Sequence, residues 1–221
     1  MSTLRQVMAL VRKDITAEVR GRPVWLASGF FAAVVLVVFV FALDLRVENK
    51  AALGPGALWI AVLFSGIIGI GRAFASESDY GRMDRLLICP VDRRAIFVAK
   101  LLGTMLFVSL VLVVLLPVFG VLFGLAVLRL DIIGVLLLGA LGIATVTTLF
   151  SAGTTHSAAR EILLPLIAFP LLLPVMIAAV KATEGIITPV VNDSPWVGLL
   201  IAYDVIFLSI GMLTFGQVMD E

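Results

Sequence analysis

The chain has 221 residues, of which 62% are hydrophobic and 14% are charged, and its net charge is +1. Soluble domains carry about 45–50% apolar residues, so a chain of this length cannot hide its apolar surface in one core, and lipid is the expected solvent. The near balance of 16 basic and 15 acidic residues gives no clustered basic surface for a nucleic acid. The single cysteine excludes an intramolecular disulfide, and with only one histidine besides, a metal site built from several cysteines or histidines is also excluded.

The first predicted element is an amphipathic helix within residues 1–23. Apolar residues recur there at helical spacing from Leu4 to Val19, and most of the charged residues lie off that stripe. Because a long apolar segment follows directly, we expect this helix to lie in the cytoplasmic membrane interface. The alternative is a helix that packs as in a soluble protein, and a cleaved signal peptide is rejected because the segment before the apolar run is too long.

Six apolar segments of about 20 residues, the length that a spanning helix needs, follow in chain order. They cover residues 24–43, 53–71, 95–128, 132–152, 162–180 and 196–218. The third is longer than one span requires, and we expect Pro117 and Gly120 to bend or end it. The predicted fold is therefore all-α: an integral membrane protein with six transmembrane helices in residues 24–218, the interfacial helix before them and a cytoplasmic tail at 219–221.

Lysine and arginine are distributed unevenly between the two sides that these spans define. If the N-terminus is cytoplasmic, twelve of the sixteen basic residues lie inside. They are Arg5, Arg12, Lys13, Arg20, Arg22, Arg72, Arg82, Arg85, Arg93, Arg94, Lys100 and Arg160. Because cytoplasmic loops carry an excess of basic residues, both termini are predicted to be cytoplasmic.

The segment between the second and third spans, residues 72–94, holds nine charged residues, more than any other segment outside the spans. Within it Arg82–Leu87 can form a short helix that ends before Pro90, with its apolar residues on one face and Asp84 and Arg85 toward the other. Acidic residues precede it, which suits a helix N-terminus. The residues alone allow two interpretations, a solvated connector or a docking element for a cytoplasmic partner.

This segment has the pattern E-x-x-x-G-x-x-x-x-L-L-x-x-P, which is similar to the coupling helix of ABC exporter permeases. The matching residues are Glu77, Gly81, Leu86, Leu87 and Pro90, with Ala99 and Lys100 closing the motif. Nearly the whole chain resembles the haem exporter protein B family (CcmB), through the stretches "GPGALWIAVLFSGIIGIGRAFASESDYGRMDRLLICPVDRRAIFVAK", "AREILLPLIAFPLLLPVMIAA" and "YDVIFLSIGMLTFGQVMDE". The resemblance implies a permease subunit of an ABC complex for cytochrome c maturation in the bacterial inner membrane. It also implies that eight residues couple to an ATPase: Glu77, Gly81, Arg82, Asp84, Arg85, Leu86, Leu87 and Pro90.

The same resemblance implies the partners. These are an ABC ATPase subunit (CcmA-like), a haem-handling membrane subunit (CcmC-like), a small accessory subunit and a second copy of the permease. The sequence contains no G-x-x-x-x-G-K-[ST], so ATP is expected to bind the partner rather than this chain. Haem is expected as the substrate, either exported itself or carried by a chaperone that the complex releases, and no residue is assigned as a haem ligand, metal ligand or catalytic group.

Two charged residues lie inside predicted spans. Asp204 lies eight residues after Trp196, about 12 Å along the helix, where a bare carboxylate is costly. Asp204 and the adjacent Tyr203 are interpreted either as pathway or subunit-contact residues, or Asp204 as a structural hydrogen-bonding residue that reaches water. Lys100, five residues into the third span, is expected to extend toward the headgroups, and the alternative is a contact on the ATPase side.

Three prolines, Pro165, Pro170 and Pro174, remove backbone donors from the fifth span. The span is either statically kinked or a flexible element that bends during transport. His156, in the short loop before it, is expected to be a polar surface residue rather than a haem ligand. Cys89 is expected to be a small packing residue in the reducing compartment.

Three other functions make different demands on the sequence. An ABC export permease for another substrate, such as a lipid or drug, would share the same architecture. An intramembrane enzyme would need two membrane carboxylates or a positioned base, and the spans offer only Asp204. A passive scaffold would not respond to charge reversal at Arg82 and Arg85.

Overall fold

The computed structural model describes residue 8 and residues 22–42, 47–79, 93–125, 127–153, 160–188 and 195–218. These residues form six helices and contain no strand. The helices are α2 (Arg22–Ala42), α3 (Val47–Asp79), α5 (Arg93–Phe123), α6 (Leu130–Gly153), α7 (Arg160–Ile187) and α8 (Trp196–Val218). The predicted all-α membrane fold is confirmed.

Five of these helices are long and apolar enough to cross a membrane. Their apolar stretches are Lys50–Ile67, Arg93–Phe123, Leu130–Phe150, Leu166–Ile187 and Trp196–Phe215. In the remaining helix, α2, the apolar stretch is shorter and covers Leu26–Ala42. The chain is therefore a multi-pass membrane protein.

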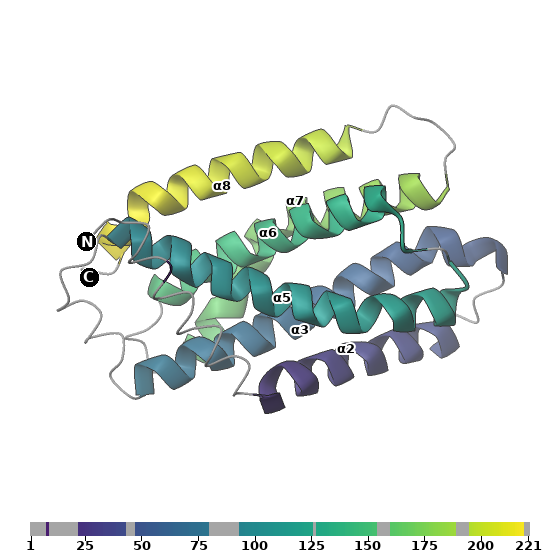
Figure 1. Ribbon diagram of the computed structural model, residues 1–221, viewed down its shortest axis with the longest axis horizontal. Coiled ribbons are helices and arrows are strands. Elements are labelled where there is room, and N and C mark those ends of the chain that lie inside the picture. Colours follow the sequence, from purple (N-terminus) through teal and green to yellow (C-terminus); the bar gives the residue numbers. More distant parts are fainter. Residues whose placement is uncertain are drawn as a thin grey trace.

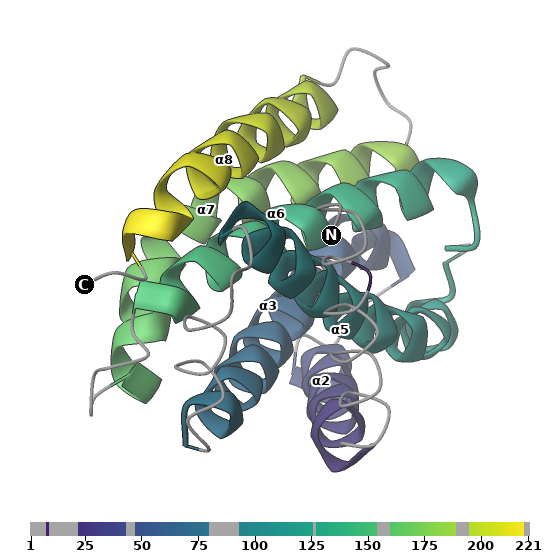
Figure 2. The ribbon, with the colours of Figure 1, turned by 60° about the vertical axis from the view of Figure 1, so that its left-hand side comes forward.

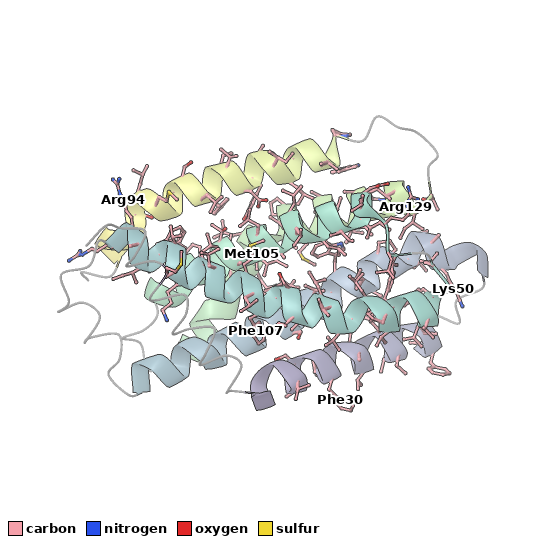
Figure 3. The ribbon with its side chains drawn as sticks, in the orientation of Figure 1. Phe30, Lys50, Arg94, Met105, Phe107 and Arg129 are labelled. Carbon is pink, nitrogen blue, oxygen red and sulfur yellow. The ribbon has the colours of Figure 1, made fainter. Side chains whose placement is uncertain are left out.

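The helices run alternately in opposite directions, so their ends gather at the two ends of the bundle (Figure 1). One end holds the last residues of α3, α6 and α8 and the first residues of α2, α5 and α7, and we call it the Arg94 end. The opposite end, here the Arg129 end, carries Arg129 and Lys50 (Figure 3). The helix ends that flank the predicted cytoplasmic loops all lie at the Arg94 end.

The centre of the bundle is formed by α3, α5, α6 and α7. Among the described residues α2 packs on α3 and α5, while α8 packs on α5, α6 and α7, so these two helices lie at opposite edges (Figure 2). Large side chains such as Trp59 and Phe119 are fully buried, whereas Phe30 is 71% exposed and points away from the bundle (Figure 3). An apolar outer surface on a well-packed interior is the arrangement expected in lipid.

The third predicted span, 95–128, corresponds to α5, which ends at Phe123. α5 passes through Pro117 and Gly120, so neither residue ends the helix, and whether either of them bends it stays a prediction. A membrane helix tolerates an internal proline where neighbouring groups satisfy the freed carbonyl. The stop is Gly124, whose φ of 67° is left-handed, and the Leu125 N–H donates to the Gly120 carbonyl at 3.2 Å. This is the six-residue hydrogen bond that closes a helix C-terminus.

The predicted loop 72–94 is shorter in the structure. α3 continues to Asp79, because no glycine or proline interrupts "RAFASESD" after Gly71, and α5 already begins at Arg93. Residues 72–79, predicted as loop, are therefore helical.

Other predicted boundaries also move. α7 covers Arg160–Ile187 rather than 162–180, and α2 begins at Arg22 rather than at residue 24. Pro23 in the first turn favours this start, because proline's missing donor would have no helical partner there. The remainder of the predicted interfacial helix, apart from residue 8, and the predicted tail at 219–221 lie outside the described residues.

Candidate functional site

The predicted ATPase-coupling segment joins α3 to α5, and only its first residue falls in a described element. Glu77 lies in the last turn of α3. The other seven predicted coupling residues lie outside the described residues: Gly81, Arg82, Asp84, Arg85, Leu86, Leu87 and Pro90. Cys89 and His156 also lie outside them.

The two helices that carry this segment are placed to spread a displacement through the whole bundle. The end of α3 and the start of α5 both lie at the Arg94 end (Figure 1). The two helices pack on each other, α3 also contacts α2, α6 and α7, and α5 also contacts α2, α6 and α8. Together, these two helices therefore contact every other described helix.

Lys100 lies on α5 about two turns from its start. The side chain is only 7% exposed and has an interaction partner, so it is buried in the bundle rather than extended along its surface. One turn further, the Thr148 hydroxyl donates to the Thr104 hydroxyl oxygen at 3.1 Å, which links α6 to α5. This part of the interface is polar, although the sequence around it is almost entirely apolar.

Tyr203 connects α8 to α7. Its hydroxyl donates to the Leu171 carbonyl at 2.6 Å, and its ring stacks on Phe207 with the centroids 4.3 Å apart. Leu171 lies three residues before Pro174, in the turn where this proline removes the donor for the Pro170 carbonyl. A hydroxyl from a neighbouring helix thus reaches the backbone of α7 where its own hydrogen bonding is interrupted.

The three prolines do not break α7. The helix is continuous through all of them, and Pro170 and Pro174 lie on its exposed side, while the backbone alone is described at Pro165. Residues of the same stretch that face the bundle, such as Leu172 and Val175, are fully buried. Bending of this helix during transport stays a prediction.

Asp204 faces into the bundle rather than outward. Its side chain is 3% exposed, and neither carboxylate oxygen has a hydrogen-bond partner among the described residues. A Cβ added at Gly142 of α6 would lie 3.0 Å from Asp204 Oδ1 and 3.1 Å from Val175 Cγ1. The carboxyl is therefore pressed against the glycine backbone of α6, beside α7.

The structure thus brings together residues that the sequence analysis treated separately. The α8 junction, as we call it, consists of Gly142 of α6, Leu171 and Val175 of α7, and Tyr203 and Asp204 of α8. Two of the predicted prolines flank its α7 side, and Lys100 lies nearer the Arg94 end. Sequence reasoning missed Gly142, because nothing in "LLLGALGIA" distinguishes the glycine that meets a carboxylate from its neighbours.

A second contact that sequence reasoning missed joins α3 to α7. The Trp59 indole N–H donates to the Thr183 hydroxyl oxygen at 3.0 Å. The ring lies so close to Gly139 of α6 that no side chain could be accommodated there. Among the described residues, no group of three or more histidine, cysteine, aspartate or glutamate side chains could hold a metal ion.

Comparison with known proteins places the chain in one family. The family model described as CcmB protein matches residues 5–220. A protein of Bradyrhizobium diazoefficiens named "Heme exporter protein B" is 26% identical over 204 residues, which cover 92% of each chain. The protein of the same name from Rhodobacter capsulatus is 32% identical, and the match covers 76% of this chain and 78% of the relative. The one from Pseudomonas aeruginosa is 29% identical, and the match covers 74% of each chain.

Proposed function

Because the chain belongs to the CcmB protein family, we propose that it is the membrane subunit of an ABC-type haem exporter complex that serves cytochrome c maturation. The observation that carries this proposal is the family match, which extends over almost the entire chain. The multi-pass helical bundle supports it, because such a subunit must lie in the bacterial plasma membrane. The chain acts here as a transport subunit rather than as an enzyme.

Energy for this function is proposed to come from a separate ABC ATPase subunit. The sequence has no phosphate-binding loop of the G-x-x-x-x-G-K-[ST] type. We propose that residues 77–90 dock on that subunit, with Arg82, Asp84 and Arg85 as the polar contacts and Leu86 and Leu87 as the apolar ones. The length of α3 supports this assignment, since 33 residues measure about 50 Å and exceed the roughly 30 Å of the hydrocarbon core.

The end of α3 adds an electrostatic argument for a partner. Its last turn contains Glu77 and Asp79 and no basic residue. Acidic side chains at a helix C-terminus face the negative end of the helix dipole, which is unfavourable unless cations approach. A basic surface on the ATPase subunit would supply them.

Movement of the ATPase subunits on ATP binding would then shift the α3–α5 connection and, through the contacts of these two helices, the rest of the bundle. The buried positions of Lys100, Tyr203 and Asp204 favour roles inside the bundle over contacts with another subunit across its outer face. The cargo step takes one of two forms, export of haem itself or release of a haem-loaded chaperone from a haem-handling membrane subunit. A second copy of this chain and a small accessory subunit complete the proposed complex. In this proposal both termini lie in the cytoplasm, and the N-terminal helix lies in the cytoplasmic membrane interface.

Charge reversal in the coupling segment tests the proposal. The double variant Arg82→Glu/Arg85→Glu should lose association with the ATPase subunit and formation of c-type cytochromes. Lys50→Glu is the matched control, because Lys50 lies at the opposite end of the bundle (Figure 3). The substrate is tested separately by deleting the gene and measuring covalent haem in periplasmic cytochromes. Unchanged cytochrome c formation in the deletion strain would exclude the proposed function and favour another exported substrate.

A further inference from the structure

α8 is attached to the bundle by a narrow stripe of residues. The buried residues of this helix are few and leave most of the remaining surface exposed and apolar. They are Leu200, Tyr203, Asp204, Gly211 and Phe215. Asp204 is the one charged residue in the sequence of α8, and it lies in this stripe rather than on the exposed side.

The groups around the Asp204 carboxyl do not compensate a negative charge. Gly142 lies against it without a side chain, and Val175, which approaches the same glycine, has no side-chain donor. The Tyr203 hydroxyl donates to Leu171, and the Thr145 hydroxyl of α6 donates to the Leu141 carbonyl at 2.8 Å. Both oxygens of Asp204 are without a hydrogen-bond partner among the residues that the structure describes.

The charged residues described in the three helices that pack on α8 donate no hydrogen bond to the Asp204 carboxylate. In α6 the described charged residue is Asp131, near the Arg129 end, which accepts from Arg129 at 2.8 Å. In α7, Lys181 pairs with Glu184 at 2.8 Å, and Arg160 and Glu161 begin the helix at the Arg94 end. In α5, Arg93 and Arg94 begin the helix, and Lys100 has its own interaction partner.

An ionised carboxylate in such a place would cost far more than a neutral carboxylic acid, because the side chain is buried and no donor among the described residues replaces its lost hydration. We propose that Asp204 is a proton-binding site that controls the docking of α8. With α8 docked on α6 and α7, the carboxyl holds a proton. When α8 separates and water reaches the carboxyl, the proton passes to water and the charged form opposes re-docking.

Proton binding and α8 docking are then linked. Any condition that favours the proton also favours the docked bundle, and any movement that undocks α8 releases a proton. This inference does not depend on the identity of the exported molecule. It concerns a property of the bundle that can be measured on the purified full-length protein in lipid vesicles.

The first test is an infrared difference spectrum between the wild-type protein and Asp204→Asn near neutral pH. The proposal predicts that the substitution removes the carbonyl stretch of a protonated carboxylic acid. Loss of the bands of an ionised carboxylate instead would overturn it. If the variant does not fold, wild-type protein with ¹³C-labelled aspartate side chains gives the same decision. An isotope-shifted carboxylic acid band must then persist at neutral pH, where exposed aspartates are ionised, and its absence would overturn the proposal.

The second test measures the docking itself. Spin labels on cysteines introduced at Leu137 of α6 and Leu213 of α8, which are 45% and 69% exposed, report the distance between the helices in a Cys89→Ser background. The distance distribution should widen with rising pH in the protein that retains Asp204. It should stay narrow in Asp204→Asn, which mimics the protonated form. A distribution that does not change with pH, or that changes equally in both proteins, would refute the coupling.

Discussion

The indole N–H of Trp59 in α3 donates to the hydroxyl oxygen of Thr183 in α7 at 3.0 Å, across 124 positions of sequence. Both side chains are fully buried, and the Thr183 hydroxyl donates in turn to the Ala179 carbonyl at 2.7 Å. The bond fixes α3, which leads into the proposed coupling segment, to α7, which borders the α8 junction. Trp59 lies 18 residues before Glu77, so the bond joins the two helices at a distance from the coupling segment itself.

Removing this bond should loosen α3 from α7. Trp59→Phe and Thr183→Val should each destabilise the protein, and the double-mutant cycle should give a coupling of about 0.6 kcal/mol, with about 1.7 kcal/mol as the upper end for such bonds in membranes. Unfolding of the purified protein in mixed micelles measures the cycle. Strictly additive effects would mean that the two groups do not interact in the lipid-embedded protein.

Gly139 should tolerate no side chain. Gly139→Ala places a methyl group into the Trp59 ring, which is rigid and buried, so we expect a loss of about 1–3 kcal/mol from overpacking. Gly134→Ala, five residues earlier in α6, is the matched control, because a Cβ there meets no atom within 4 Å. Thermal unfolding should separate the two variants, and equal stabilities would contradict the observed packing of α3 on α6.

Gly211 sets the approach of α8 to α5. A Cβ at Gly211 would collide with the ring of Phe97, which also packs on Phe215 with the centroids 5.1 Å apart. Gly211→Ala should therefore displace α8 and lower the thermal midpoint, while Gly198→Ala on the same helix should not, because a Cβ there meets no atom within 4 Å. Thermal unfolding and limited proteolysis of the two variants measure this difference. If Gly211→Ala resisted unfolding and proteolysis as well as the control, the packing of α8 on Phe97 would be contradicted.

The Tyr203 hydroxyl should stabilise α7 at its interrupted turn. Tyr203→Phe keeps the stacking on Phe207 and removes only the bond to the Leu171 carbonyl, for an expected loss of about 0.5–1.5 kcal/mol. Ser209→Ala removes a hydroxyl that bonds only to its own helix, at Val205, and should change stability little. Hydrogen exchange of the α7 amides around Pro174 should rise in the first variant alone. If amide exchange rose in both variants, or in neither, the Tyr203 hydroxyl would not stabilise this turn of α7.

Much of the fold can be predicted from sequence, because apolar length and basic loop residues are strong, additive signals. The start of α8 at Trp196 and the six-helix order follow from them directly. The ends of helices are harder. The extension of α3 to Asp79 is not visible as an apolar pattern. Pro117 does not end α5, because a membrane helix tolerates an internal proline, whereas Gly124 ends α5 through its left-handed conformation.

The site was only partly predictable for a related reason. Asp204 stands out in sequence as a charge within an apolar span, yet its surroundings depend on which side of α8 faces the bundle. Gly134, Gly139 and Gly142 look alike in the chain, and only long-range packing against Trp59 and Asp204 separates them. The link between the prolines of α7 and Tyr203 likewise depends on a contact between helices.

The proposed function requires that the α3–α5 connection faces the cytoplasm and binds an ATPase subunit. Because Cys89, the one cysteine of the chain, is expected to pack, the probe is a cysteine introduced at Asp92 in a Cys89→Ser background. The decisive measurement is labelling of this cysteine with a membrane-impermeant maleimide in spheroplasts and in inverted membrane vesicles. The account predicts labelling in inverted vesicles only, with protection when the ATPase subunit is bound. Labelling in intact spheroplasts would place the connection outside the cell and contradict the account.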